Sequence, residues 1–91
     1  MCPSGFSSNS DSSLPEEFRF LCMLHNIGAT TQEHSLTIEE IAKWTLMEIS
    51  VIRVHLRRLM EMGYVESTRI NETDKYNLTH SGIRKVLSLY S

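Results

Sequence analysis

Residues 47–63 read MEISVIRVHLRRLMEMG, and this stretch decides the fold. Its apolar side chains recur at intervals of three and four, which places four of them on one stripe of a helix: Ile49, Ile52, Leu56 and Leu59. The polar side chains between them point away from the stripe, and three of the four are arginines: Ser50, Arg53, Arg57 and Arg58. Gly63 is expected to end the helix, because glycine readily adopts the left-handed conformation that closes a helix.

The residues after Gly63 predict a β-hairpin. Residues 64–69 (YVESTR) and 75–79 (KYNLT) are typical of strands, and residues 70–74 (INETD) are typical of a turn. A helix that exposes arginines and leads directly into a hairpin is the layout of a winged helix-turn-helix. The predicted fold class is therefore α+β, mostly α, with a three-helix core, a β-hairpin wing and a C-terminal helix.

The length and composition of the chain predict one small domain. The chain has 91 residues, 41% of them hydrophobic, and a domain of this size often buries its remaining apolar surface by dimerising. No apolar run is long enough to span a bilayer, and the start of the chain lacks the charged and apolar regions of a signal peptide. Cys2 and Cys22 are too few for a disulfide scaffold. We therefore expect a cytoplasmic protein.

The charge is distributed unevenly along the chain. The net charge of −2 argues against a protein that binds nucleic acid by bulk charge alone. Residues 1–42 contain six acidic side chains and one arginine, whereas residues 43–91 contain eight basic and five acidic ones, so the two parts carry −5 and +3. The positive part holds the arginine-bearing helix and the hairpin, which would face a phosphate backbone.

A tail and one helix are expected before residue 30. Residues 1–12 are rich in serine and carry little that could pack, so we expect a disordered tail, with the domain over residues 13–91. The first helix is predicted over residues 14–27, with Ser13 as N-cap and Glu16 as its capping-box partner. Its apolar side chains occupy two faces, and a small core needs one of them. We expect a partner chain to cover the other, the alternative being a helix wrapped entirely by its own core.

Two further helices are predicted to form a helix-turn-helix. Thr37 and Glu40 match a capping box, which starts a helix that ends near Trp44. A short turn follows, and the arginine-bearing helix covers residues 47–62, although residues 45–48 (TLME) match a capping box as well and leave its first residue open. Two helices joined by three or four residues are typical of this motif. Leu36, with Ser35, is expected to form a short strand that pairs with the hairpin.

The last helix is predicted over residues 80–90, with Thr79 as its N-cap. Like the first helix, it carries more apolar surface than one core face needs. We therefore expect the two helices to build a homodimer interface from seven side chains: Phe20, Leu24, Ile27, Val86, Leu87, Leu89 and Tyr90.

Residues 36–65 (LTIEEIAKWTLMEISVIRVHLRRLMEMGYV) resemble the helix-turn-helix of archaeal and bacterial winged-helix transcription regulators of the MarR, ArsR and PadR type. Their pattern has an I-A pair and then V-x-x-x-L-x-x-L-x-x-x-G-x-V, which here falls on Ile41, Ala42, Ile52, Leu56, Leu59, Gly63 and Val65. Their segment Y-x-L-T-x-x-G, which leads into the last helix, falls on Tyr76, Leu78, Thr79 and Gly82. The resemblance covers residues 35–90 and indicates a regulator of prokaryotic, archaeal or archaeal-virus type.

Two positions depart from the family pattern. The turn usually offers a Leu-Gly pair where this chain has Thr45 and Leu46, so the turn geometry can differ. The recognition helix usually opens with Ser or Thr, and the aligned residue here is Glu48. Its carboxylate would repel phosphate, although it can also accept a hydrogen bond from cytosine N4.

The resemblance implies a homodimer that binds double-stranded DNA sequence-specifically, with the helix of residues 47–62 in the major groove. Its first half would meet base edges through Ser50, Val51, Arg53 and Val54, with Arg53 contacting guanine. Arg57 and Arg58 would hold phosphates, and Arg69 and Lys75 would flank the wing turn near the backbone. No cofactor is expected.

The sequence is also compatible with other interpretations. The runner-up is a winged helix that docks its arginine face on an acidic protein partner. Cys22 and His25 could face a metal, with His55 or His80 completing the set, but no second cysteine or carboxylate has suitable spacing, and no metal site is expected. Nothing in the sequence predicts an enzyme. His55 is expected to be a surface or packing residue. Packing roles are expected for other side chains: Trp44, Met47, Met60 and Met62.

Overall fold

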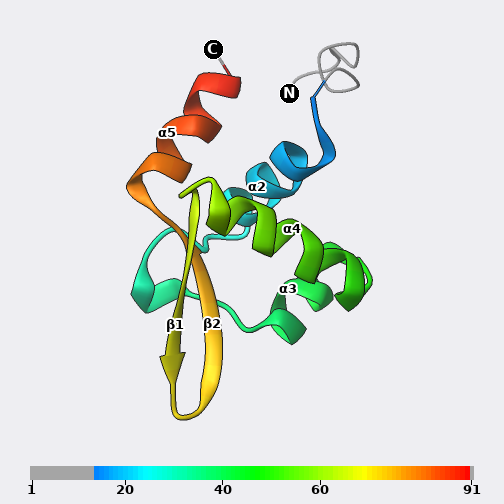
Figure 1. Cartoon of the computed structure of the whole chain (residues 1–91), viewed down its shortest axis with the longest axis vertical. Coiled ribbons are helices and arrows are strands. Elements are labelled where there is room, and N and C mark those ends of the chain that lie inside the picture. Colours follow the sequence, from blue (N-terminus) through cyan, green and yellow to red (C-terminus); the bar gives the residue numbers. More distant parts are fainter. Residues whose placement is uncertain (1–13, 91) are drawn as a thin grey trace.

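The computed structural model describes residues 14–90. Its elements, in chain order, are α2 (Glu16–Asn26), the short 3₁₀ helix η1 (Gln32–His34), α3 (Ile38–Thr45), α4 (Ile49–Glu61), β1 (Val65–Ile70), β2 (Thr73–Leu78) and α5 (His80–Leu89). The hairpin projects from one end of the helical body and α5 from the opposite end (Figure 1). The predicted winged helix-turn-helix is confirmed, whereas the predicted tail and Ser13 lie outside the described residues.

Helix α2 begins two residues later than predicted. Its N-cap is Pro15, which makes no side-chain capping bond, and the Pro15 carbonyl accepts from the N–H groups of Phe18 and Arg19, both at 3.1 Å. Gly28 follows the helix at φ +91°, and the Ala29 N–H donates to the Leu24 carbonyl at 3.0 Å. Helix α2 therefore ends at Asn26, one residue before its predicted end.

The helix-turn-helix contains one of the two possible capping boxes. At the start of α3, the Glu40 N–H donates to Thr37 Oγ1 (3.1 Å), and the Thr37 N–H donates to Glu40 Oε1 (2.9 Å). Thr45 forms no second box, because its hydroxyl donates back to the Ile41 carbonyl (2.8 Å). Helix α4 begins at Ile49 with Glu48 as an N-cap that makes no side-chain bond, so the recognition helix starts two residues later than predicted.

The hairpin is tighter than the sequence predicted. Its strands pair antiparallel from Val65↔Leu78 to Ile70↔Thr73, which leaves only two residues, Asn71 and Glu72, in the turn. Both have positive φ, 51° and 64°, the geometry that matches the twist of paired strands. The predicted pairing of Leu36 with the hairpin is confirmed, as Leu36 and Tyr76 exchange backbone hydrogen bonds of 2.9 and 2.8 Å.

One core joins α2, α3, α4 and α5 to the base of the hairpin. Helix α2 packs against both α4 and α5, so both of its apolar faces are covered within one chain. This corrects the predicted dimer interface at three positions that are fully buried in this core, namely Phe20, Leu24 and Val86. The wrapped helix, weighed as the alternative, describes α2 better. The buried apolar side chains are Phe20, Leu21, Leu24, Ala29, Ile38, Ile41, Ile52, Leu56, Leu59, Val65, Leu78 and Val86.

Some side chains expected to pack inside lie at the surface. Trp44 is 65% exposed, because the buried face of α3 runs through Ile38 and Ile41 and leaves position 44 on the flank. Met60 and Met62 are exposed beyond the buried stripe of α4, and Ile49 is exposed at its first position. Within residues 14–90, none of the helices combines the length and apolar character needed to cross a membrane.

Candidate nucleic-acid interface

Helix α4 separates an inward face from an outward face as its sequence predicts. Ile52, Leu56 and Leu59 are buried in the core, and His55 is buried beside them with its ring stacked on Phe20 at 5.3 Å between centroids. This stacking is a direct contact between α4 and α2. All the α4 side chains that were predicted to contact DNA are exposed: Ser50, Val51, Arg53, Val54, Arg57 and Arg58.

One flank of α4 borders a shallow groove beside the start of α2. The groove has a volume of about 400 Å³ and is lined by Glu16, Glu17, Ser50, Val51, Val54, His55 and Arg58. Arg58 Nη1 lies 4.0 Å from Glu17 Oε2, so a carboxylate of α2 partly neutralises one of the three arginines. Sequence reasoning missed this neighbour, because no local pattern relates two residues 41 positions apart.

Arg53 lies outside this groove, and its guanidinium influences Tyr76 on β2. Burial raises the pKa of the Tyr76 hydroxyl, the nearby Asp74 and Glu39 carboxylates raise that pKa further, and the Arg53 guanidinium opposes them. Arg53 therefore lies within electrostatic range of β2, away from the groove that contains Arg58. Of the predicted arginine cluster, Arg58 therefore lines the groove, whereas Arg53 and Arg57 do not.

The wing carries its basic side chains close to acidic ones. Arg69 and Asp74 are opposite each other in the strand register, and Arg69 Nε donates to Asp74 Oδ1 at 3.2 Å. Lys75 is half-buried on β2, and Glu72 is exposed in the turn. Arg69 and Lys75 thus lie on the wing as predicted, but the net charge near the turn is small.

Thr79 and Gly82 join the end of α4 to the start of α5. The Thr79 hydroxyl donates to the Gly63 carbonyl (2.6 Å) and accepts from the Gly82 N–H (3.0 Å), while the Thr79 N–H donates to the Tyr64 carbonyl (3.0 Å). A Cβ on Gly82 would collide with the Tyr64 carbonyl. The T-x-x-G spacing therefore has a structural purpose, since it fixes the base of the wing against the last helix.

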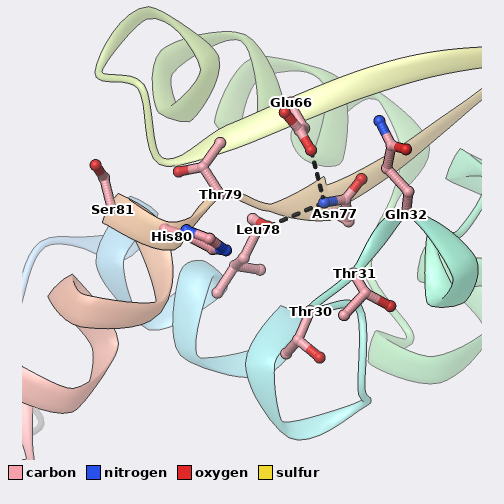
Figure 2. Close-up of a pocket in the computed structure, with 9 residues that line it drawn as sticks. All are labelled: Thr30, Thr31, Gln32, Glu66, Asn77, Leu78, Thr79, His80 and Ser81. Atoms are coloured by element: carbon pink, nitrogen blue, oxygen red, sulfur yellow. Dashed lines mark hydrogen bonds between the residues drawn. The ribbon is translucent and has the colours of Figure 1, made fainter.

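A second, polar pocket of about 530 Å³ lies at the base of the wing (Figure 2). Asn77 is 2% exposed there, and its Nδ2 donates to Glu66 Oε2 (3.1 Å) and to the Leu78 carbonyl (2.9 Å). This side chain cross-links the two strands near their junction with α5. The other lining residues are Thr30, Thr31, Gln32, Thr79, His80 and Ser81.

The metal alternative gains no support from the geometry of α2. Cys22 and His25 are both half-buried on this helix. Within the described part of the chain, no group of three or more His, Cys, Asp or Glu side chains is arranged to hold a metal ion.

Residues 32–67 match the sequence profile of a family described as "Bacterial regulatory protein, arsR family". The structure is similar to that of a mutant MarR from E. coli, with a TM-score of 0.70 and 19% identity over 89% of this chain. It is equally similar to the DNA-binding TubR fragment from Clostridium botulinum, with a TM-score of 0.70 and 21% identity over 94% of this chain. The chain is a winged helix-turn-helix protein.

A third relative of this winged helix-turn-helix protein is a mutant MepR from S. aureus, bound to an oligodeoxyribonucleotide. It has a TM-score of 0.70 and 21% identity over 91% of this chain. The chain spans 99% of the TubR fragment but only 58% of the MarR chain and 59% of the MepR chain. A comparison with curated proteins found no match. The predicted resemblance to ArsR-type and MarR-type winged helices is confirmed.

Proposed function

We propose that this protein is a transcription regulator that binds double-stranded DNA sequence-specifically, with α4 in the major groove. The observation that carries the proposal is the outward face of α4, on which exposed Ser50, Arg53 and Arg57 extend from a helix packed on α2. Two structural relatives support it through their bound ligands: a mutant MepR bound to an oligodeoxyribonucleotide and a mutant MarR complexed with operator DNA.

The position of each basic or apolar side chain along α4 and on the wing suggests its role. Ser50, Val51, Arg53 and Val54 belong to the first half of the helix, which enters the groove first in this kind of docking. We assign Arg53 a bidentate contact with guanine O6 and N7. Arg57 and Arg58 would hold phosphates, and Arg69 and Lys75 would approach the backbone beside the groove.

We also propose that the protein acts as a homodimer through the outer surface of α5 and the end of α2. With the core residues excluded, the remaining candidates are Ile27, Leu87, Leu89 and Tyr90. Leu87 and Tyr90 are 54% and 61% exposed, on the helix that projects from the body (Figure 1). A twofold axis through α5 would place two recognition helices on half-sites one helical turn apart, about 34–36 Å.

Selection from random duplex DNA, followed by affinity measurements across salt concentrations, tests the proposal. We expect recovery of a palindromic site and an affinity that falls log-linearly with salt, since each neutralised phosphate releases counterions. Arg53→Ala should weaken binding and relax the preference at one guanine, whereas Arg84→Ala, an exposed arginine on α5, should change neither. Recovery of no preferred duplex would contradict the proposal.

The second candidate is a winged helix that docks its arginine face on an acidic protein. The net charge of −2 and the acidic Glu72 and Asp74 at the wing tip favour it, because DNA docking would bring the wing near phosphates and docking through α4 alone would not. Binding to DNA that is weak and blind to sequence in the same selection would favour this second candidate.

A further inference from the structure

Two exposed valines on α4 have no role in the fold. Val51 and Val54 are 40% and 45% exposed, and neither belongs to the core nor to the side chains packed against it. Valine also has a lower helix propensity than the alanine, lysine or glutamate that usually occupies a solvated helix face. The stability of the isolated domain therefore does not explain why valine occupies these two positions.

The two valines form one small apolar surface. They are three residues apart on a helix, which brings their Cβ atoms to about 5–6 Å from each other. Both line the groove beside α2, whose other walls include Ser50 and Arg58. Arg53 does not line this groove, so the apolar surface and the predicted guanine contact occupy different places on the helix.

The chemistry of α4 restricts how it could recognise an A·T pair. The amides that pair bidentately with adenine belong to Asn and Gln, and α4 (ISVIRVHLRRLME) contains neither. In the major groove, an A·T pair also presents the C5-methyl group of thymine, which is recognised by apolar contact. Val51 and Val54 supply such a contact in the half of the helix that enters the groove.

We propose that Val51 and Val54 recognise the C5-methyl groups of thymines in the DNA half-site. The inference rests on the proposed function and adds its base preference: one or two thymines, at base pairs separate from the guanine that Arg53 contacts. Because successive bases rise by about 3.4 Å along one strand, the spacing of the valines matches thymines on adjacent or next-adjacent pairs.

The test removes one methyl group at a time. In the duplex recovered by selection, each thymine of a half-site is replaced singly by 2′-deoxyuridine, which lacks only the C5-methyl group, and the dissociation constant is measured by fluorescence anisotropy. We expect about a fourfold loss of affinity at one or two positions, the factor that corresponds to about 0.8 kcal/mol for one buried carbon group. Deoxyuridine at other positions should have little effect.

Matched variants identify the side chain responsible. Val51→Ala or Val54→Ala should remove the difference between thymine and deoxyuridine at its own position, whereas Met60→Ala, exposed on the same helix, should preserve it. Val54→Thr keeps the branched shape with one methyl fewer and should give an intermediate result. Thermal unfolding of each variant checks that the fold is intact.

The outcomes separate the inference from the function on which it rests. Sequence-selective binding that tolerates deoxyuridine everywhere would overturn the inference and leave the proposed function standing. A loss that persists unchanged in both alanine variants would also overturn it, since the methyl would then act through DNA stacking. If no duplex is bound selectively, the proposed function fails, and the inference fails with it.

Discussion

At the scale of single residues, Gly82 shows how closely the wing and the last helix approach each other. The residue lies in the first turn of α5, where its N–H is held by the Thr79 hydroxyl and its Cα faces the Tyr64 carbonyl. Any Cβ at this position would have to displace backbone, because the atom it meets is a carbonyl oxygen and not a flexible side chain. The position of β1 relative to α5 therefore depends on the absence of one carbon atom.

Gly82→Ala should lower the free energy of unfolding by about 1–3 kcal/mol, the usual cost of overpacking, even though alanine is the better helix former. Urea denaturation measures the change. Ser81→Ala, at the exposed neighbouring position, is the matched control and should stay within about 0.5 kcal/mol of the parent protein. Equal stability of the two variants would show that β1 and α5 can separate freely.

Glu17 is a second single residue that should affect function, because it should lower the affinity for DNA. Its carboxylate lies 4.0 Å from Arg58, which we propose holds a phosphate, so it should both neutralise the arginine and repel that phosphate. Glu17→Gln should tighten DNA binding up to about fivefold, which corresponds to the upper end of about 1 kcal/mol for an exposed ion pair. Glu33→Gln, an exposed acid on η1, should leave the affinity unchanged. Weaker binding by Glu17→Gln would indicate that the carboxylate positions Arg58 for its contact.

At the scale of the elements, the local signals in the sequence predicted most of the structure correctly. The capping box of Thr37 and Glu40 and the cap at Thr79 depend on residues three apart, and both formed as expected. The sequence predicts starts for α2 and α4 that are each two residues too early. The observed N-caps, Pro15 and Glu48, make no side-chain hydrogen bond, so no capping pattern in the sequence marks them. The hairpin turn was predicted too long, since neither Asn71 nor Glu72 is a glycine, although both adopt positive φ.

The turn between α3 and α4 stores strain that a substitution can release. Leu46 stands where related turns carry glycine, and it adopts the left-handed conformation at φ 60° while 90% exposed. This conformation destabilises an L-residue by about 1–2 kcal/mol, whereas glycine adopts it without that cost. Leu46→Gly should therefore raise the free energy of unfolding by about 1 kcal/mol, less the entropy that glycine loses on folding. Urea denaturation measures the gain. Leu46→Ala keeps the strain and should change little, so a gain in this control would assign the effect to the exposed side chain.

At the scale of the whole molecule, prediction was limited by contacts between distant parts of the chain. The sequence showed that α2 has two apolar faces, but the packing of α2 against both α4 and α5 settled which of them are covered. The exposed face of α4 could be derived from helical periodicity alone. The acidic neighbour of Arg58 and the strand pairing of Arg69 with Asp74 could not, since they depend on how the elements assemble. The exposure of the candidate side chains on α4 was therefore predictable from the sequence, whereas their electrostatic surroundings were not.

The proposed dimer depends on what remains exposed after the monomer has folded. Leu87→Glu should abolish the dimer, because the substitution places a charge in the α5 surface without touching the buried core, and sedimentation velocity measures the change directly. Ser81→Glu adds the same charge to the first turn of α5, outside the proposed interface, and should remain dimeric. Loss of the dimer should also weaken binding to a palindromic duplex by about 100-fold or more while leaving the affinity for a single half-site unchanged, because two linked contacts reinforce each other. A Leu87→Glu protein that sediments as the parent does would move the interface away from α5, and the half-site spacing expected from this geometry would then no longer hold.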